Sequence, residues 1–206
     1  MTGLTMSLQL TIRKGASFLW TLRPETAAQR YIPITAITMT ETGVRLAAAG
    51  HGMVEGWRFR VSRCKGLTRL NTVDEDHPRQ ADYFQATVID ADTVEINSRN
   101  TTGDKAYAGG GILQYGVPMD LTGCVVRAQI RPTARSDTVM LDLAPYITVD
   151  AANFRIDFDV PASETSLLAG SGGVLGVEIE GTAPAPSVIS LPAIAVTFEL
   201  EIVRDE

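Results

Sequence analysis

Apolar and polar residues alternate with a period of two along most of the chain, and helical spacing is almost absent. The longest alternation covers residues 194–202, where every second side chain is apolar. Successive side chains of a β-strand point to opposite faces, so this pattern predicts half-buried strands. Short helical segments are expected only at Thr26–Gln29 and Ser163–Leu168. The sequence therefore predicts an all-β fold whose last strand is central in its sheet or strongly packed.

The outer parts of the chain carry the clearest alternation and predict one β-sandwich. Lys14-Gly15 separates the first two predicted strands, which favours a hairpin there. Trp20 shares the phase of Phe18 and Leu22, so we expect it in the core. The predicted strands of this part cover residues 8–12, 18–22, 124–131, 154–160, 173–180 and 194–203.

The middle of the chain has weaker alternation and more glycine and charge. A strongly charged excursion at 74–79 is expected in solvent. Five short strands fit a small β-barrel inserted into the sandwich. They are expected at 34–39, 43–47, 57–61, 83–89 and 93–97. The predicted boundaries are 1–32 and 114–206 for the sandwich and 33–113 for the barrel.

Composition excludes several classes of partner. The 206 residues contain 18 Lys and Arg against 24 Asp and Glu, a net charge of −6, which argues against nucleic acid because phosphate binding needs a basic surface. No apolar stretch approaches the roughly 20 residues that cross a bilayer. The first twelve residues lack the pattern of a signal peptide. We expect no nucleic acid or membrane partner, and synthesis in a cytoplasm.

The few residues with metal-binding or nucleophilic chemistry lack the spacing of a site. Cys64, Cys124, His51 and His77 form no CxxC or HxxxH motif, so no metal or other cofactor is expected. Whether the two cysteines pair is left open. His51 is interpreted as fixing a turn rather than as a base for Cys64.

Two other groups invite a functional interpretation. The glycines at 109–111 lack the Lys-Ser/Thr of a phosphate loop and are interpreted as a flexible return. The carboxylates Asp142, Asp150, Asp157 and Asp159 fall on strands rather than in one calcium-type loop, so a solvated face is favoured. Glu199 and Glu201 would discourage edge pairing of the last strand, or form a docking face. No catalytic residue is predicted.

Four elements in the outer parts occur in an order that resembles a known domain. They are the strand ending at Lys14-Gly15 with the apolar strand after it, Pro118-Met119-Asp120-Leu121-Thr122-Gly123 with its strand, the strand and turn at 154–166, and two closing strands. This order is similar to the N-terminal immunoglobulin-like domain of baseplate and tail proteins of tailed bacteriophages. The resemblance implies an immunoglobulin-like β-sandwich.

The middle resembles a small β-barrel module that also occurs in ubiquitin-activating enzymes and is widespread in phage virion proteins. The matching residues are His51-Gly52-Met53, Gly56, 59–61, Gly66 to Leu70-Asn71, and Tyr107-Ala108-Gly109-Gly110. Residues 72–82 are longer than the usual link and would carry surface particular to this chain. The module is not the catalytic centre of those enzymes, so no ubiquitin chemistry is implied.

The two resemblances imply a non-enzymatic structural protein of a phage virion, located on the tail. Expected partners are other tail or baseplate proteins, with a tail fibre as a further one, and the chain is expected as a homo-oligomer or in many copies. Trp57, Arg58 and Arg60 are the candidate interface residues. The alternatives are a head decoration or head-fibre protein, and a carbohydrate-binding module that recognises the host or depolymerises its glycans.

Overall fold

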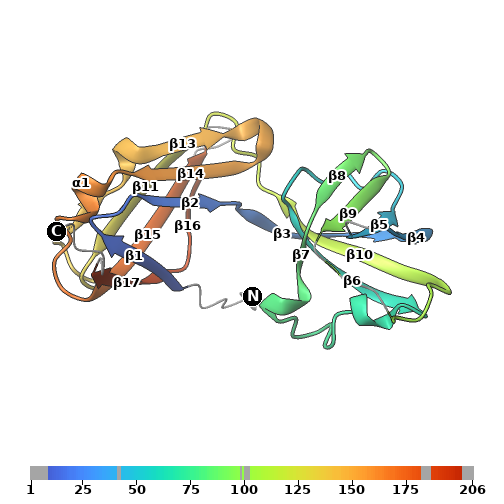
Figure 1. Cartoon of the computed structure of the whole chain (residues 1–206). Helices are drawn as coiled ribbons and strands as arrows, with labels where there is room; N and C mark the ends of the chain where they lie inside the picture. The colour runs from blue at the N-terminus through green and yellow to red at the C-terminus, as the bar shows by residue number, and fades with distance from the viewer. Residues whose placement is uncertain (1–8, 41–42, 98, 100–102, 182–186, 201–206) are drawn as a thin grey trace. The chain divides into compact units, whose positions relative to one another are not determined.

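The computed structural model describes residues 9–40, 43–97, 99, 103–181 and 187–200. Over these residues the chain is all-β, with one short α-helix, α1 (Ala162–Thr165), and four 3₁₀ turns (Figure 1). The chain divides into two compact units. The first comprises Met1–Arg23 and Asp120–Glu206, and the second comprises Pro24–Met119.

The first unit contains two sheets. The larger has the order β1-β17-β15-β11-β12, with β16 also paired to β15, and the smaller has the order β13-β14-β2. The larger sheet consists of β1 (Gln9–Lys14), β17 (Ile194–Leu200), β15 (Gly172–Gly181), β11 (Val125–Arg131), β12 (Leu141–Asp142) and β16 (Ser187–Ser190). The smaller consists of β13 (Ile147–Asp150), β14 (Arg155–Val160) and β2 (Phe18–Leu22). Two sheets with one apolar face each fit a β-sandwich.

The period-two pattern of the sequence is the burial pattern of this unit. Every second side chain of four strands is buried, and the intervening ones are mostly more exposed. The buried set comprises Val126, Ala128 and Ile130 on β11, Ile156, Phe158 and Val160 on β14, Leu175, Val177 and Ile179 on β15, and Ile194, Val196 and Phe198 on β17. Trp20, expected in the core, is only partly buried, and its ring stacks on the buried Phe158 with ring centroids 4.9 Å apart.

Two expectations about the first and last strands have different outcomes. The last strand is internal, because β17 lies between β1, with which it runs parallel, and β15. Residues 201–203 of its predicted range, with Glu201, lie outside the described residues. The hairpin expected at Lys14-Gly15 is wrong. Gly15, with φ of 82°, instead passes the chain from β1 in one sheet to β2, which pairs with β14 in the other.

The second unit also contains two sheets, of four strands each. One has the order β3-β10-β6-β7 and the other β4-β5-β9-β8. The first consists of β3 (Glu25–Pro33), β10 (Gly109–Pro118), β6 (Arg58–Lys65) and β7 (Phe84–Gln85). The second consists of β4 (Ala36–Met39), β5 (Gly43–Ala47), β9 (Thr93–Asn97) and β8 (Thr87–Asp90). That this unit forms a closed barrel stays a prediction.

The structural boundaries differ from those expected at 32/33 and 113/114. Along the chain, one unit gives way to the other at 23/24 and at 119/120, because β3 and β10 pair with each other inside the second unit. Thr26–Gln29, expected as a helical turn, is part of β3. The glycines Gly109–Gly111 are not a free return either. They begin β10, and the first two pair with Lys65 and Cys64 of β6.

Candidate interaction surface

The sheet formed by β3, β10 and β6 has one face that is unusually polar. Its cross-strand register aligns Tyr31 with Gln114 and Gln114 with Arg60. Directly aligned residues of paired strands lie on the same face of a sheet. The alternation along the strands adds Gln29 and Arg58 to this face. We call this surface the polar face; Glu25 and Gly116 lie at one end of it.

Trp57, the first of the predicted interface residues, is not on a surface. Its side chain is completely buried, with 0% exposure. The indole N–H donates a hydrogen bond of 3.0 Å to the carbonyl of Gly116. A buried Trp needs such a partner for its one polar group. The prediction that Trp57 contacts a partner is therefore wrong for this structure, since the residue holds β10 to the core of its own unit.

Arg58, the second predicted residue, lies on the polar face and forms a two-pronged pair with Glu25 of β3. The Nε–Oε1 and Nη2–Oε2 distances are 2.5 and 2.9 Å. The hydrogen bond that Arg58 donates to Glu25 raises the pKa of the guanidinium, against the opposing effect of burial. The guanidinium also lies 5.1 Å from the ring centroid of Tyr83. Arg58 is thus oriented by its own unit, while its side chain keeps 39% exposure.

Gly116 makes room for this ion pair on β10. A Cβ placed at this glycine would lie 2.3 Å from Glu25 Oε2. Real Cβ atoms do not approach another atom so closely, so a larger residue at position 116 would displace the Glu25 carboxylate from this place. The same residue accepts the Trp57 indole bond through its carbonyl. Gly116 therefore leaves space for the Glu25 carboxylate and also accepts the hydrogen bond from Trp57.

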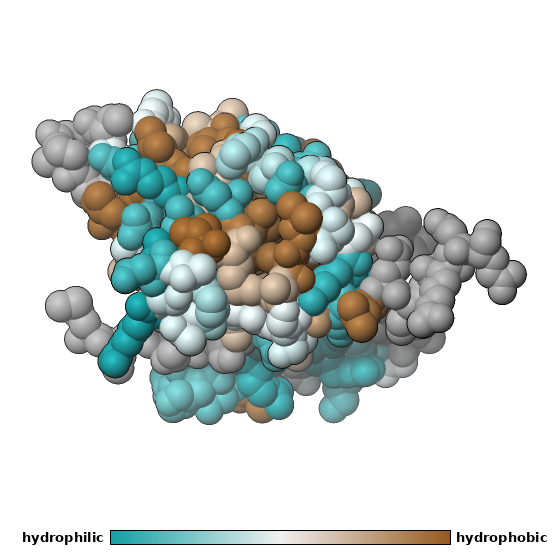
Figure 2. Space-filling view, turned by 90° about the vertical axis from the view of Figure 1, so that its left-hand side faces the viewer, coloured by the Kyte–Doolittle hydropathy of each residue, from teal (hydrophilic) through white to brown (hydrophobic). Residues whose placement is uncertain are grey.

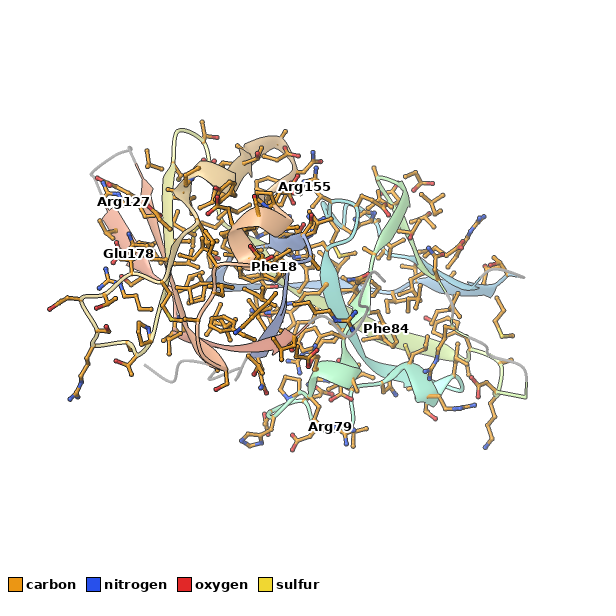
Figure 3. The ribbon with its side chains drawn as sticks, turned by 60° about the vertical axis from the view of Figure 1, so that its left-hand side comes forward. Phe18, Arg79, Phe84, Arg127, Arg155 and Glu178 are labelled. Carbon is orange, nitrogen blue, oxygen red and sulfur yellow. The ribbon has the colours of Figure 1, made fainter. Side chains whose placement is uncertain are left out.

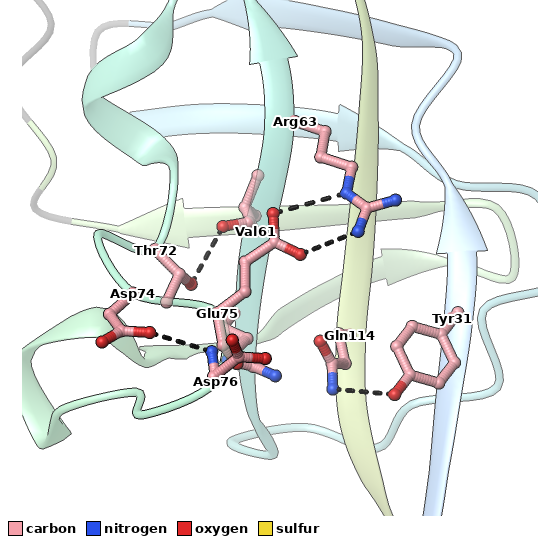
Figure 4. A network of polar contacts seen from close by, with 9 residues as sticks. Tyr31, Val61, Arg63, Thr72, Asp74, Glu75, Asp76 and Gln114 are labelled. Atoms are coloured by element: carbon pink, nitrogen blue, oxygen red, sulfur yellow. Dashed lines mark hydrogen bonds and ion pairs between the residues drawn. The ribbon is translucent and has the colours of Figure 1, made fainter.

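Arg60, the third predicted residue, is covered by the long segment that follows Asn71. Its Nη1 donates to the carbonyl of Glu75 at 2.9 Å, and the residue is only 9% exposed. Arg63 of the same strand holds the Glu75 carboxylate through two hydrogen bonds, of 3.3 and 3.1 Å (Figure 4). The hydroxyl of Thr72 donates to the Val61 carbonyl. The excursion is exposed at residues 74–77 and 79, as expected, and Glu75 anchors it to β6.

The uncovered part of the polar face is centred on Tyr31. The side-chain amide of Gln114 donates to the Tyr31 hydroxyl at 3.2 Å (Figure 4). Gln114 itself is 7% exposed, whereas Tyr31 is 60% exposed. The buried amide of Gln114 thus restrains an aromatic ring that stays exposed to solvent. Sequence reasoning missed this residue because β3 has no alternation of apolar side chains.

His51 and Cys64 do not form a nucleophile and base. The buried His51 ring accepts a hydrogen bond from the Met53 N–H at Nδ1, and its Nε2 donates to the Asp90 carbonyl at 2.9 Å. It fixes a turn, as its sequence context predicts. Burial raises the pKa of the Cys64 thiol to about 11, so the thiol stays protonated near neutral pH. Cys64 and Cys124 are both free thiols.

Two of the four carboxylates considered in the first unit, Asp150 and Asp157, pair with Arg155 of β14. Its Nε lies 3.1 Å from Asp150 and 3.0 Å from Asp157 (Figure 3 labels Arg155). Hydrogen bonds from Asn153 lower the pKa of Asp150. Asp142 accepts the N–H of Ala144. Within the described residues, no group of three or more His, Cys, Asp or Glu side chains is placed to hold a metal ion.

The surface of the first unit carries scattered apolar side chains. Leu19 and Leu200 are 71% and 75% exposed, and Figure 2 shows apolar residues in brown among polar ones. A shallow depression there is lined by residues of β1, β2 and β17, including Arg13, Phe18, Leu19 and Glu199 (Figure 3 labels Phe18). Arg13 lies 3.8 Å from Glu199, so this carboxylate faces the neighbouring strand.

The chain matches no known protein-family model, and it matches no curated protein. In the described residues, no helix is long and apolar enough to cross a membrane.

Proposed function

We propose that the chain is a structural protein of a tailed-bacteriophage virion that docks on the tail or baseplate. It acts through surface contacts, in many copies, and mediates assembly or the attachment of a fibre. Repeated weak contacts in a closed assembly add up to firm attachment. A position on the head, as a decoration or head-fibre protein, is the alternative within the same class.

The observation that supports this proposal is the role of the residues that carry the two resemblances. In the Asp120 to Gly123 turn, Asp120 Oδ1 accepts the Thr122 N–H at 2.9 Å, and Gly123 has a positive φ of 69°. In the second unit, Asn71 exchanges two hydrogen bonds with the backbone of Cys64. These residues use their polar groups to hold turns of their own chain. We therefore expect exposed side chains of the strands to bind the partner proteins.

A second observation supports the resemblance in the second unit. The Tyr107 hydroxyl donates to the Gly110 carbonyl at 2.6 Å and lies 3.1 Å from the Ile34 carbonyl oxygen. Gly66, with φ of 80°, lies so close to Ala106 that a Cβ would be 1.9 Å from its carbonyl oxygen. Both residues thus fix the return into β10, which Tyr107-Ala108-Gly109-Gly110 marks in the sequence.

Incorporation into particles tests the proposal. Gradient-purified virions from cells that produce the chain would be analysed by quantitative mass spectrometry. We expect several copies of the chain per particle, in constant ratio to a tail protein. A chain that stays in the particle-free fraction would overturn the proposal.

The exposed Tyr31 favours one further candidate, a carbohydrate-binding module. Aromatic rings pack on sugar faces, and Gln29 and Gln114 place amides beside the ring. A glycan array would distinguish this function. Binding that is lost in Tyr31→Ala, while Tyr83→Ala retains it, would support a glycan site. If no glycan on the array binds the chain, the carbohydrate-binding candidate is rejected and the structural proposal remains.

A further inference from the structure

β2 is a sheet edge that carries no charge. Among the described residues it pairs on one side with β14 and has no strand on its other side. Of the strands that end a sheet in the described part of the chain, it is the longest without a charged residue. Its sequence also contains no Pro. Charged side chains, Pro and bulges are the usual protection of a sheet edge against pairing with another chain.

The ladder between β2 and β14 is regular over the whole strand. The aligned pairs run without a shift and end with Phe18 opposite Val160. An aligned antiparallel pair either exchanges its own hydrogen bonds or is flanked by bonds from the next residues. Pro161, the residue that would supply the flanking N–H beyond Val160, has none. Phe18 and Val160 therefore bond to each other directly.

This direct bond determines which backbone groups of β2 are free. Successive residues of a paired strand direct their N–H and C=O groups alternately to either side. Phe18, Trp20 and Leu22 therefore bond to β14. Leu19 and Thr21 direct their N–H and C=O groups to the open side. Leu19 also lines the shallow depression described above, so the unit is open to solvent there.

The side chains of β2 leave apolar surface uncovered on both faces of the sheet. Leu19, on the outer face, is 71% exposed. Trp20 and Leu22, on the inner face, are only partly buried, although Trp20 stacks on the buried Phe158 of β14. Burial of apolar surface is favourable, so a strand added at the open edge would be held by side chains as well as by backbone hydrogen bonds.

We propose that the open edge of β2 binds β2 of a second copy of this chain, antiparallel and with a two-fold axis at Trp20. The strand runs from 18 to 22, so residue 20 is its midpoint and this register pairs its full length. Leu19 of each copy then lies opposite Thr21 of the other. Both residues have outward N–H and C=O groups, so each of these pairs is a hydrogen-bonded pair.

The side chains of β2 are self-complementary in this register. The two Trp20 residues lie opposite each other at a non-hydrogen-bonded position, where facing side chains are closest. With Phe158 of each copy they form an aromatic row on the inner face of the joined sheet. Phe18 lies opposite Leu22 on that face, and on the outer face the smaller Thr21 covers the exposed Leu19. No position of the pairing carries a charge.

A second copy is the partner that these features favour, because the strand matches its own sequence in reverse. The inference rests on the multi-copy part of the proposed function, and it names the surface at which two copies meet. Its tests use purified protein alone, so a failure here leaves the virion assignment standing. A dimer of a chain that particles lack would have the reverse meaning.

Cross-linking tests the register. In a Cys124→Ser background, Leu19→Cys and Thr21→Cys place thiols at positions that face each other only between copies. Position 19 of one copy and position 21 of the other would have Cα atoms about 5.5 Å apart, within the range of a disulfide. The two copies of position 19, like those of position 21, would be roughly 9 Å apart, which is outside that range.

We therefore expect mild oxidation of an equimolar mixture of Leu19→Cys and Thr21→Cys to give a covalent heterodimer, identified by peptide mapping. Each variant alone should give no covalent dimer. Thr148→Cys, at an exposed position of β13 in the same sheet, is the matched control and should not cross-link with either variant.

A proline in the strand tests the backbone bonds. Thr21→Pro removes an N–H that faces the open side, so the bonds to β14 remain while the pairing between copies is blocked. Thr21→Val is the matched control, because it also removes the hydroxyl that bonds to Asp157 but keeps the N–H. By sedimentation velocity we expect the wild type and Thr21→Val to dimerise, and Thr21→Pro to have a dissociation constant raised about thirtyfold. Far-UV circular dichroism checks that each variant is folded.

A monomeric wild type over the whole concentration range would overturn the inference. A dimer that oxidation does not link between positions 19 and 21 would also overturn it, as would a dimer that folded Thr21→Pro leaves at full strength. Binding of a foreign strand to monomers through β2 would count against it in the same way. If Thr21→Pro does not fold, the cross-linking result decides.

Discussion

Replacing Trp57 by Phe tests the internal role that the structure gives to this residue. The indole is fully buried and donates to the Gly116 carbonyl at 3.0 Å. Phe fills most of the apolar space but leaves that carbonyl without its donor. An orphaned buried acceptor costs about 1–3 kcal/mol. The missing ring volume of roughly 40 Å³ adds about 1 kcal/mol if the site does not collapse.

We therefore expect Trp57→Phe to lower the free energy of unfolding of the second unit by about 2–4 kcal/mol. Urea unfolding followed by far-UV circular dichroism measures this loss. In this variant Trp20 is the remaining indole, and it belongs to the first unit, so its fluorescence transition should keep the wild-type midpoint. The matched variant Trp20→Phe leaves Trp57 as the reporter of the second unit.

A loss below about 0.5 kcal/mol, typical of a surface substitution, would refute the reasoning. Trp57 would then be accessible, and its role as an interface residue would be restored. A shift of the Trp20 transition as large as the dichroism shift would also count against it, because the substitution would then act on both units.

Three further predictions follow from the described contacts. His51→Ala leaves the Met53 N–H and the Asp90 carbonyl unpaired, and we expect a loss of about 2–4 kcal/mol in urea unfolding; a loss near zero would contradict the turn-fixing role. With a thiol reagent at pH 8, Cys124 should react in the folded protein and Cys64, whose pKa is about 11, only after denaturation; equal rates would contradict its burial. The hydrogen bond from the Arg79 backbone N–H lowers the pKa of Asp82. The charged Asp82 carboxylate therefore stabilises the fold above the ordinary carboxyl pKa near 3.9, and this stabilisation is lost as the pH falls through the lowered folded value. Asp82→Asn should be less stable at pH 7 and lose less on acidification than the wild type, as thermal melts at pH 7 and below pH 4 would measure.

The alternation of the sequence predicted those strands that bury one face. In β11, β14, β15 and β17 the core takes every second side chain, so the apolar pattern is the burial pattern. The strands at Gly43–Ala47 and Thr93–Asn97 also have their predicted bounds, although Glu95 is buried between Val94 and Ile96. Which strands pair was harder to predict from the sequence, because the turn signal at Lys14-Gly15 fits a hairpin and also fits a chain that passes from one sheet to the other.

The polar face could not be predicted from the pattern. β3 buries neither face, so its sequence carries no period, and β10 begins with three glycines that suggested a loop. Arg58 and Arg60 were identified as candidates, but their partners Glu25 and Glu75 lie 33 and 15 residues away in the sequence. Trp57 was misjudged because one residue before a strand can face either way. Only the tertiary register decides these positions.

Immunogold labelling of intact particles, with an antibody raised against the recombinant chain, tests the central claim most directly. The proposed function predicts gold at the distal tail or the tail collar. Gold on the head would contradict the tail assignment and favour a decoration protein, and the absence of gold from particles would contradict a virion role altogether.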